Sequence, residues 1–591
     1  MQKISDLRAL MKERNLDGYI IPSGDAHASE YMSSYWRVRA WISGFTGSAG
    51  ILVVTHDKAG LWTDGRYHIQ AARELEGTGI DLFKDGERDV PTHLKFLADN
   101  LPLGGKLGFD GRTTSANEFK NIKNALKDKA ITYAYEEDLA GQLWKDRPPM
   151  PTAKAFEHEP QFAGLAAAGK LAKVRDKMKE KGFSAYLVAP LDEIAWLLNI
   201  RGFDVPNLPV VYAFVLITEN EAHVFIDPDK ITDISVKLAA QGFTLHDYNA
   251  LPEFLSKLTG SKLYYNGLKT NMLITEAVSE GITTESKPIY DIIPMLKAVK
   301  SQEEIANIKN AFIKESVVLV KMLKWLDEAV KADSVQKLKE GDIARKLEEL
   351  RKQQPHFLFD SFATIPAYGP NAAQAHYSPD TDGAQLKADG FLLVDTGGQY
   401  LDGTTDTTRT ITIGPLTDEM KRDFTLVLQG HIAIARAEFL SGTTGSALDI
   451  LARLPLWQDG QNYRHGTGHG LGYCLSVHEG PHGITPRHNP VALAPGMLIS
   501  NEPGIYKEGR YGIRTESIVL VVNKQKNSDG EFLALETITH CPIDLNAIMA
   551  EMLTPVERDW LNNYHATTYE TLSPHLNDDE REWLKQATRP I

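Results

Sequence analysis

The first half of the chain repeats itself, and this repetition limits the folds open to it. MKERNLDGYIIP (Met11 to Pro22) resembles MKEKGFSAYLVAP (Met178 to Pro190), and each predicts the end of a basic helix, a turn and an apolar strand. GILVVTHDKAGLWTD (Gly50 to Asp64) resembles AFVLITENEAHVFID (Ala213 to Asp227), and each predicts two strands around a polar turn. We therefore expect two similar α/β domains, separated by the proline-rich linker KDRPPMP (Lys145 to Pro151).

A third region of different character begins at Ser301. SQEEIANIKNAFIKESVVLVKMLKWL places Glu304 three residues after Ser301, a capping-box signature, and continues with apolar residues at helical spacing. Another charged helix is expected near 343–351. From about Ser361 the chain turns to short β-like runs broken by glycine and proline, and the last part predicts short terminal helices.

Composition excludes several classes of protein. A length of 591 residues suggests three or four domains at about 150 residues each. The net charge of -14 and the lack of a long basic run argue against a nucleic-acid binder. The two cysteines form neither a disulfide framework nor a cysteine-based zinc site. The N-terminus predicts an amphipathic helix rather than a signal peptide, and no stretch is apolar enough to cross a membrane, so we expect a cytoplasmic protein.

Residues 478–482 read HEGPH and match the zinc-protease pattern H-E-x-x-H. In that pattern a helix places both histidines on one face, and the glutamate acts as general base. Gly480 and Pro481 disfavour the helix, because proline costs roughly 3 kcal/mol in a helix interior and glycine about 1 kcal/mol. The segment is therefore expected to form no zinc site of this kind.

Carboxylates collect at predicted strand ends in the third region. Asp395 ends the apolar run GFLLVD, and Asp406 begins the returning run TTRTITI after the turn GGQYLDGTTD, so a hairpin would bring the two together. Glu502 follows the apolar run MLISN, and YGIRTESIVLVV predicts Glu516 inside another strand. His469 lies in the glycine-rich segment YRHGTGHGLG, and the five side chains form a candidate site.

Four carboxylates and one imidazole are costly to gather in a core without cations. Two divalent ions would balance the four negative charges, and mainly oxygen ligands favour manganese-type ions over a structural zinc site. The ordinary alternative is that the acidic residues are solvated at strand ends and that His465 and His469 belong to a surface loop. Spacing alone does not decide between the two interpretations.

The third region contains, in this order, the motifs VDTGGQYLDGTTDTTRT, HGTGHGLG, VHEGP, SNEPGIY and GIRTES. Together these motifs resemble the pita-bread metallopeptidases, and within them the long, three-domain Xaa-Pro aminopeptidases. ISGFTGSAG with LWTDGRYHIQA is similar to the N-terminal domain of that group, WLLNIRG to its second domain and WLNNYH to the end of its catalytic domain. The resemblance covers the whole chain and preserves the order of the motifs.

The resemblance implies a binuclear metal centre. Asp395 would bind one ion, Asp406 and Glu516 would bridge both ions, and the other ion would be held by His469 and Glu502. A hydroxide that bridges the ions would attack the scissile carbonyl. The ions are expected to be Mn²⁺, with zinc and cobalt as alternatives.

The same resemblance implies further roles around the metals. His376 and His478 would flank the substrate, as catalytic and substrate-binding residues, and His465 would support the site or contact substrate. Glu502 would also shuttle a proton. Arg514 would hold a metal-bound carboxylate from behind.

The implied activity is release of the N-terminal residue from peptides with proline at the second position. The implied architecture is α/β: two creatinase-type domains at 1–155 and 156–298 and a pita-bread catalytic domain at 299–591. A homodimer is the family expectation; neither nucleic acid nor a membrane is expected as partner. The first alternative is an Xaa-Pro dipeptidase (prolidase), and the second is a metal-free peptide- or histone-binding protein on the same fold.

Two residues near the site are expected to have no part in the chemistry. Cys474 is interpreted as a small core residue, because a nucleophilic role has no support in the pattern. His482, the second histidine of HEGPH, is expected to be a solvent-exposed loop residue.

Overall fold

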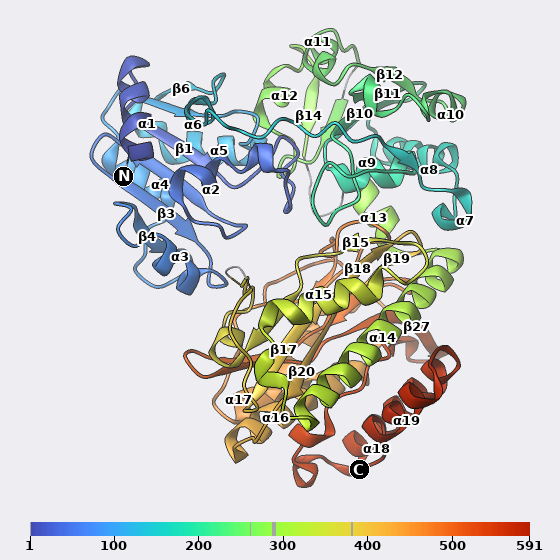
Figure 1. Ribbon diagram of the computed structural model, residues 1–591. Helices are drawn as coiled ribbons and strands as arrows, with labels where there is room; N and C mark the ends of the chain where they lie inside the picture. Colours follow the sequence, from blue (N-terminus) through green and yellow to red (C-terminus); the bar gives the residue numbers. More distant parts are fainter. Residues whose placement is uncertain (1, 261, 287–290, 380–381) are drawn as a thin grey trace. The chain divides into compact units, whose positions relative to one another are not determined.

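The computed structural model describes residues 2–260, 262–286, 291–379 and 382–591 (Figure 1). The chain divides into two compact units, one formed by residues 1–160 and 165–293 and the other by residues 161–164 and 294–591. No helix within the described ranges is both long enough and apolar enough to span a bilayer.

The first unit begins with a six-stranded sheet in the order β4-β3-β2-β1-β5-β6. The β1–β2 and β2–β3 pairs are antiparallel, whereas the outer pairs β3–β4, β1–β5 and β5–β6 are parallel. Helix α1 (Gln2–Glu13) buries Ile4, Leu7 and Met11 against this sheet, as its amphipathic pattern predicts. The strands are β1 (Gly18–Pro22), β2 (Ile51–Thr55), β3 (Ala59–Thr63), β4 (Asp81–Lys84), β5 (Lys106–Phe109) and β6 (Thr132–Ala134).

A second six-stranded sheet follows in the same unit, in the order β12-β11-β10-β8-β13-β14. This order repeats that of the first sheet, and the antiparallel and parallel pairs fall at the same places. The repeat expected from the sequence is thereby confirmed as two copies of one topology. The strands are β8 (Ala185–Val188), β10 (Ala213–Thr218), β11 (Ala222–Ile226), β12 (Thr244–His246), β13 (Lys262–Tyr265) and β14 (Thr283–Glu285).

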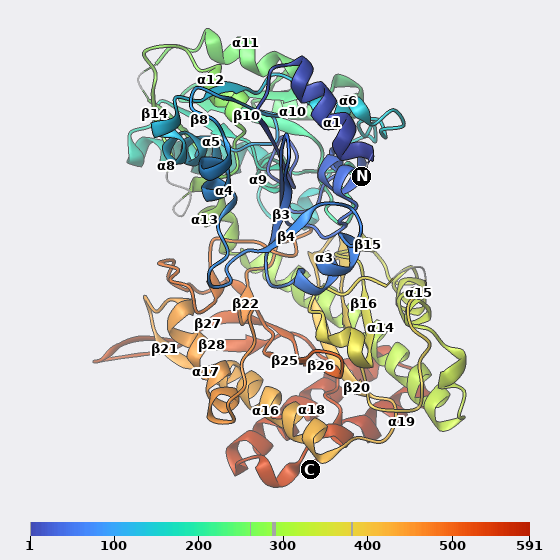
Figure 2. The same ribbon diagram turned by 90° about the vertical axis from the view of Figure 1, so that its left-hand side faces the viewer.

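The second unit opens with α14 (Gln302–Lys331), which starts at the predicted capping box: Ser301 accepts from the Glu304 backbone, and Glu304 caps Ser301 in return. Helix α15 (Glu340–Arg351) and the C-terminal α19 (Asp578–Ala587) pack against α14, side by side in both ribbon views (Figures 1 and 2). Residues Leu392 and Val394 of a neighbouring strand lie in the core under α14 and α15.

Short antiparallel sheets fill the rest of this unit. One has the order β16-β17-β20 and another the order β21-β28-β27-β24, with α16 and α17 packed beside each other over them (Figure 2). The bounds are β16 (Ile365–Tyr368), β17 (Phe391–Thr396), β20 (Thr407–Thr412), β21 (Glu438–Leu440), β24 (Leu498–Asn501), β27 (Ser517–Asn527), β28 (Gly530–Thr537), α16 (Asp418–Ala435), α17 (Gly445–Gln458) and α18 (Pro555–Leu572).

Candidate metal centre

Strands β17 and β20 bring the first two carboxylates together. They pair antiparallel, with Asp395 opposite Thr408, so Asp406 lies just before the paired segment and next to Asp395. Alternation along β17 places Asp395 on the same face as Phe391, away from the side chains that pack under α14 and α15. The intervening segment is more than the expected turn, because it forms β18 (Gly398–Tyr400) and β19 (Gly403–Thr404).

Two further carboxylates come from positions where strands end. Glu502 follows β24 directly, and its backbone N–H donates to Thr467 O. The prediction that Glu516 lies inside a strand is wrong: it lies in the break between β26 (Tyr511–Arg514) and β27. The chain changes sheets there, because β26 pairs with β25 (Gly504–Lys507) while β27 pairs with β24 and β28. The break turns the Glu516 side chain into the site.

The imidazole of His469 completes the group. His469 lies on the two-residue strand β22 (Gly468–His469), and its Nε2 is 3.5 Å from Asp406 Oδ2 and 3.5 Å from Glu502 Oε1. One ligand atom from each of Asp406, His469 and Glu516 lies within 4.8 Å of the others. The alternative of a solvated surface loop does not describe this residue, since His469 is half-buried among carboxylates.

The site is electrostatically strained without a cation. Burial raises the pKa of Asp395, Glu502 and Glu516, and repulsion from the neighbouring carboxylates raises it further. Burial opposes a charge on His469, but its hydrogen bond with Asp406 and the charges of Glu502 and Asp406 raise its pKa to about 9. The shifts of these four groups all favour the protonation state that reduces the excess negative charge.

The donor atoms fit divalent ions. Asp395 Oδ1 is fully buried and accepts no hydrogen bond from any described residue, although Oδ2 is bonded. An orphaned carboxylate oxygen beside three other carboxylates is a free ligand position for a hard cation. Four carboxylates and one imidazole match the oxygen-rich donor set that binuclear sites use.

Three side chains support the carboxylates from behind. Arg514 donates from Nη2 to Asp395 Oδ2 at 2.5 Å and from Nη1 to Tyr506 Oη at 2.8 Å. Tyr506 Oη in turn lies 2.9 Å from His465 Nε2, and Nδ1 of His465 lies 2.7 Å from Gly466 O. Burial and the charge of Arg514 lower the pKa of His465 to about 3. His465 is therefore a neutral ring at the end of a chain that runs through Tyr506 and Arg514 to Asp395.

The sequence analysis did not identify three supporting groups: Tyr506, Thr408 and Ser500. Tyr506 stands inside the quoted motif SNEPGIY, but nothing in its spacing marks its hydroxyl. Thr408 donates to Glu516 Oε2 at 2.7 Å, and Ser500 donates to Glu502 Oε1 at 3.1 Å. A threonine in TTDTTRT is an ordinary strand residue by pattern. Only the register of β17, β20 and β24 reveals these partners.

The remaining histidines take different places. His478 packs edge-on against His469 with the ring centroids 4.4 Å apart. His376 is half-buried in the turn after the short helix η7 (Gly369–Ala373), which packs against β17 and β26. The expectation of a solvent-exposed His482 is wrong: the ring is 5% exposed, and its Nε2 lies 2.8 Å from Leu498 O. Burial lowers its pKa to about 4, so it is a neutral core residue.

HEGPH forms no helix; residues 478–482 are irregular and lead into β23 (Gly483–Ile484). Cys474 is a fully buried free cysteine, in agreement with its expected core position.

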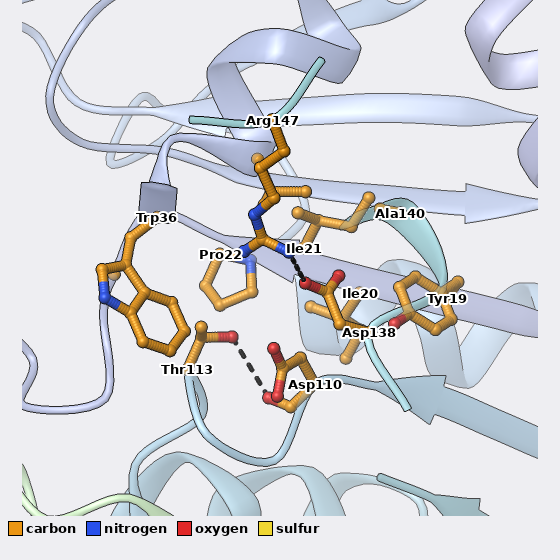
Figure 3. A pocket seen from close by; sticks show the side chains of 12 residues that line it. Tyr19, Ile20, Ile21, Pro22, Trp36, Asp110, Thr113, Asp138, Ala140 and Arg147 are labelled. Atoms are coloured by element: carbon orange, nitrogen blue, oxygen red, sulfur yellow. Dashed lines mark hydrogen bonds and ion pairs between the residues drawn. The ribbon is translucent and has the colours of Figure 1, made fainter. Parts of the chain in front are cut away.

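A small pocket lies in the first sheet domain, and none of the predicted site residues lines it (Figure 3). Trp36, Pro22, Thr113 and Asp110 surround it, and Arg147 from the proline-rich linker pairs with Asp138 at its edge at 2.7 Å.

Comparison with known proteins agrees with this geometry. Residues 306–523 match metallopeptidase family M24, and residues 531–591 match the C-terminal region of peptidase M24. Residues 3–137 and 146–304 each match a creatinase/prolidase N-terminal domain. The chain is 41% identical to a probable Xaa-Pro aminopeptidase P of Laccaria bicolor, over all of this chain and 93% of the relative.

Solved structures show the same relation. The crystal structure of X-prolyl aminopeptidase from Caenorhabditis elegans, described as a cytosolic enzyme with a di-nuclear active site, superposes with a TM-score of 0.94 and 33% identity. The match covers 100% of this chain and 99% of the Caenorhabditis elegans chain. Xaa-Pro dipeptidase from Bacillus anthracis shares the fold at a TM-score of 0.50 and 23% identity but covers 64% of this chain. The chain therefore belongs to metallopeptidase family M24, as a full-length relative of its Xaa-Pro aminopeptidases.

Proposed function

We infer that this protein is an Xaa-Pro aminopeptidase, which releases the N-terminal residue from peptides with proline at the second position. The observation that carries the assignment is the convergence of Asp406, His469 and Glu516 at ligand distance, on a chain that matches such enzymes along its whole length. The prolidase alternative is less well supported, because the dipeptidase fold accounts for about two thirds of the chain.

Five residues would hold two divalent ions: Asp395, Asp406, His469, Glu502 and Glu516. We propose Mn²⁺ as the native ion, since four of the five ligands are hard carboxylate oxygens. Bound ions would supply an activated water at neutral pH and polarise the scissile carbonyl.

The side chains of the site hold and move the remaining groups. We propose that Glu502 carries the proton from the attacking water to the leaving proline nitrogen, with Ser500 Oγ holding its Oε1 in place at 3.1 Å. His478, beside His469, would face the substrate and steady the developing oxyanion or the proline carbonyl, and His376 would flank it from the turn after η7. Arg514, Tyr506 and His465 keep the Asp395 carboxylate in one orientation.

The chemistry of the substrate agrees with this assignment. The nitrogen of an Xaa-Pro bond carries no hydrogen, so an enzyme cannot use that donor to orient the bond. Orientation through the carbonyl oxygen, by histidine N–H donors and by the ions that the carboxylates would hold, needs no such hydrogen. The free α-amino group of the substrate is a cation, which an acidic site attracts.

The test compares an Xaa-Pro-Yaa tripeptide with the Xaa-Pro dipeptide in the presence of Mn²⁺. An aminopeptidase cleaves the tripeptide with the larger kcat/KM, whereas activity confined to the dipeptide would identify a prolidase. A chain that purifies without metal and stays inert when Mn²⁺ is added would instead be a binding protein on the same fold.

We also propose that the protein works as a cytoplasmic homodimer. The solved relative is described as cytosolic. For the dimer, helix α17 presents Ile450, Leu454 and Trp457 to solvent, each more than 40% exposed. Their spacing places them on one face of the helix, and an apolar stripe on one surface helix suits a twofold contact with its own copy.

The three-domain division expected at 155/156 and 298/299 likewise stays a proposal. It is supported by the two sheets of equal topology and by the boundaries of the matched families.

A further inference from the structure

Glu479, the acidic residue of HEGPH, belongs to a buried cluster of charges next to the metal centre. Its Oε2 accepts from Lys297 Nζ at 2.9 Å and its Oε1 from Lys300 Nζ at 2.9 Å. Lys300 Nζ also donates to Lys297 O at 2.7 Å. All three side chains are at most 3% exposed. We call Lys297, Lys300 and Glu479 the lysine clamp.

Stability alone does not account for a cluster of this kind. Removing charged groups from water costs several kcal/mol per ion, and apolar side chains of the same volume are often as stable in such a position. An ion cluster also fixes the position of its members, because a carboxylate that accepts a hydrogen bond at each oxygen is held in one position and one orientation. A fixed Glu479 can in turn fix the groups that contact it.

The backbone of Glu479 packs closely against the glycine-rich loop that follows His469. Its N–H donates to Gly470 O at 2.8 Å. A Cβ at Gly470 would lie 2.1 Å from Glu479 O, and one at Gly472 would lie 2.9 Å from Glu479 Oε2. Only glycine permits this approach, so the loop after His469 is shaped to receive Glu479.

Each of the two segments in contact, at Glu479 and at Gly470, is preceded by a histidine of the site. His478 directly precedes Glu479, and His469 directly precedes Gly470, so the joined loops bring the rings into their edge-on contact at 4.4 Å. The clamp holds this junction from the other side, through Lys297 at the end of α13 (Ile292–Ala298) and Lys300 just before α14.

We propose that Glu479 is a positioning residue: held by Lys297 and Lys300, it fixes the His478 ring against His469 and thereby places His478 toward the substrate. Glu479 touches neither substrate nor metal and acts through His478. The inference rests on the proposed function, since peptide cleavage is the reaction that His478 would serve. It gives the second residue of HEGPH a role that is neither that of a zincin base nor that of a ligand.

A double-mutant cycle on the Mn²⁺-loaded enzyme tests the proposal. Glu479→Gln keeps the size of the side chain and removes its charge, and we expect kcat/KM to fall about 10- to 100-fold from a displacement of His478. In a His478→Ala background the same substitution should change kcat/KM less than twofold, because its effect passes through the missing ring. Metal content should stay at the wild-type value. Effects that simply multiply in the double variant would overturn the proposal.

Lys314→Met is the matched control, because it breaks another buried lysine–carboxylate pair in the same unit, to Asp402 at 2.6 Å. Its effect, whatever its size, should multiply with that of His478→Ala. If Glu479→Gln does not fold, the triple change Lys297→Met, Lys300→Met and Glu479→Met replaces the whole clamp with apolar groups. A folded triple variant with wild-type kcat/KM would equally refute the proposal.

A crystal structure of Glu479→Gln provides a readout that needs no activity. We expect the distance between the ring centroids of His469 and His478 to differ from the 4.4 Å of the wild type, whereas an unchanged distance would contradict the inference. A wild-type enzyme that cleaves no Xaa-Pro-Yaa peptide would refute the proposed function, and the ring geometry would still decide the role of the clamp.

Discussion

Arg514 Nη2 donates to Asp395 Oδ2 at 2.5 Å, while Oδ1 of the same carboxylate is buried and unbonded among the residues that the structure describes. The guanidinium therefore holds one oxygen of Asp395 and leaves the other directed at the cluster. A carboxylate oriented in this way binds a cation without first losing rotational freedom.

Arg514→Met should weaken metal binding without removing a ligand. The loss of an orienting partner typically costs 10- to 100-fold in metal affinity, so half-maximal activation should need about 10- to 100-fold more Mn²⁺. Arg510→Met is the control, since Arg510 lies four residues away and pairs with Glu419 at the surface. Titration of activity against free Mn²⁺ checks both variants, and coincident curves for Arg514→Met and wild type would contradict the orienting role.

Metal binding should stabilise the second unit. The buried carboxylates repel one another in the metal-free protein, and an ion that binds only the folded state at 100 times its Kd adds about 2.7 kcal/mol to the free energy of unfolding. Calorimetry of chelator-treated protein should show one transition that rises in temperature when Mn²⁺ is added. Asp110→Asn, in the first unit, should keep this rise and Asp406→Asn should lose it. No rise in the wild type would count against the site.

Acid should destabilise the protein through His565. This ring is fully buried in α18, and its Nε2 accepts from the Ile543 N–H at 3.1 Å, which requires a neutral ring. Burial and the nearby arginines Arg409 and Arg589 lower its pKa to about 3, against about 6.5 in an unfolded chain. The unfolded state therefore binds a proton at pH 5 that the folded state does not, so stability falls as the pH drops below about 6.5. The loss at pH 5 is about 2 kcal/mol.

His565→Gln keeps an acceptor for Ile543 and removes the titration. Its Tm should fall less than that of the wild type between pH 7 and pH 5. His575→Gln, at an exposed position, should follow the wild type. Equal falls for all three proteins would show that His565 does not contribute to the acid sensitivity.

Much of the metal site is readable from the sequence because its residues stand at strand ends. Asp395 and Glu502 follow continuous apolar runs, and such runs predict strands well. The predicted strand through Glu516 is wrong because the break itself is Thr515-Glu516, with neither glycine nor proline, so nothing at these two positions marks the change from one sheet to another. The change follows from strand pairing: β26 pairs with its hairpin neighbour β25, whereas β27 pairs with β24, which precedes that hairpin.

Buried charges are the part that sequence does not reveal. Lys297, Lys300 and Glu479 belong to residue types that are mostly exposed, and their burial depends on contacts between segments about 180 residues apart. The burial of His482 escaped prediction for a similar reason. Its partner is a backbone carbonyl, Leu498 O, and a backbone group has no sequence signature.

Trp457→Glu should break the proposed dimer. A charge at Trp457, in the stripe that it forms with Ile450 and Leu454, would be buried without a partner in a twofold contact. Light scattering should report a monomer for this variant and a dimer for the wild type. Val556→Glu, an equally exposed apolar position on α18, should remain dimeric. A dimeric Trp457→Glu would place the interface elsewhere.

The most direct test of the binuclear account compares wild type with Asp406→Asn in Mn²⁺, on Arg-Pro-Pro and on Arg-Ala-Pro peptides, with metal content measured on the same samples. Asp406 is one of the two carboxylates assigned to both ions, and Asn keeps its size but not its charge. We predict that the wild type binds two ions per chain and cleaves only the peptide with proline in second position, and that Asp406→Asn loses bound metal and activity together. An Asp406→Asn variant that cleaves Arg-Pro-Pro at the wild-type rate would contradict the assignment.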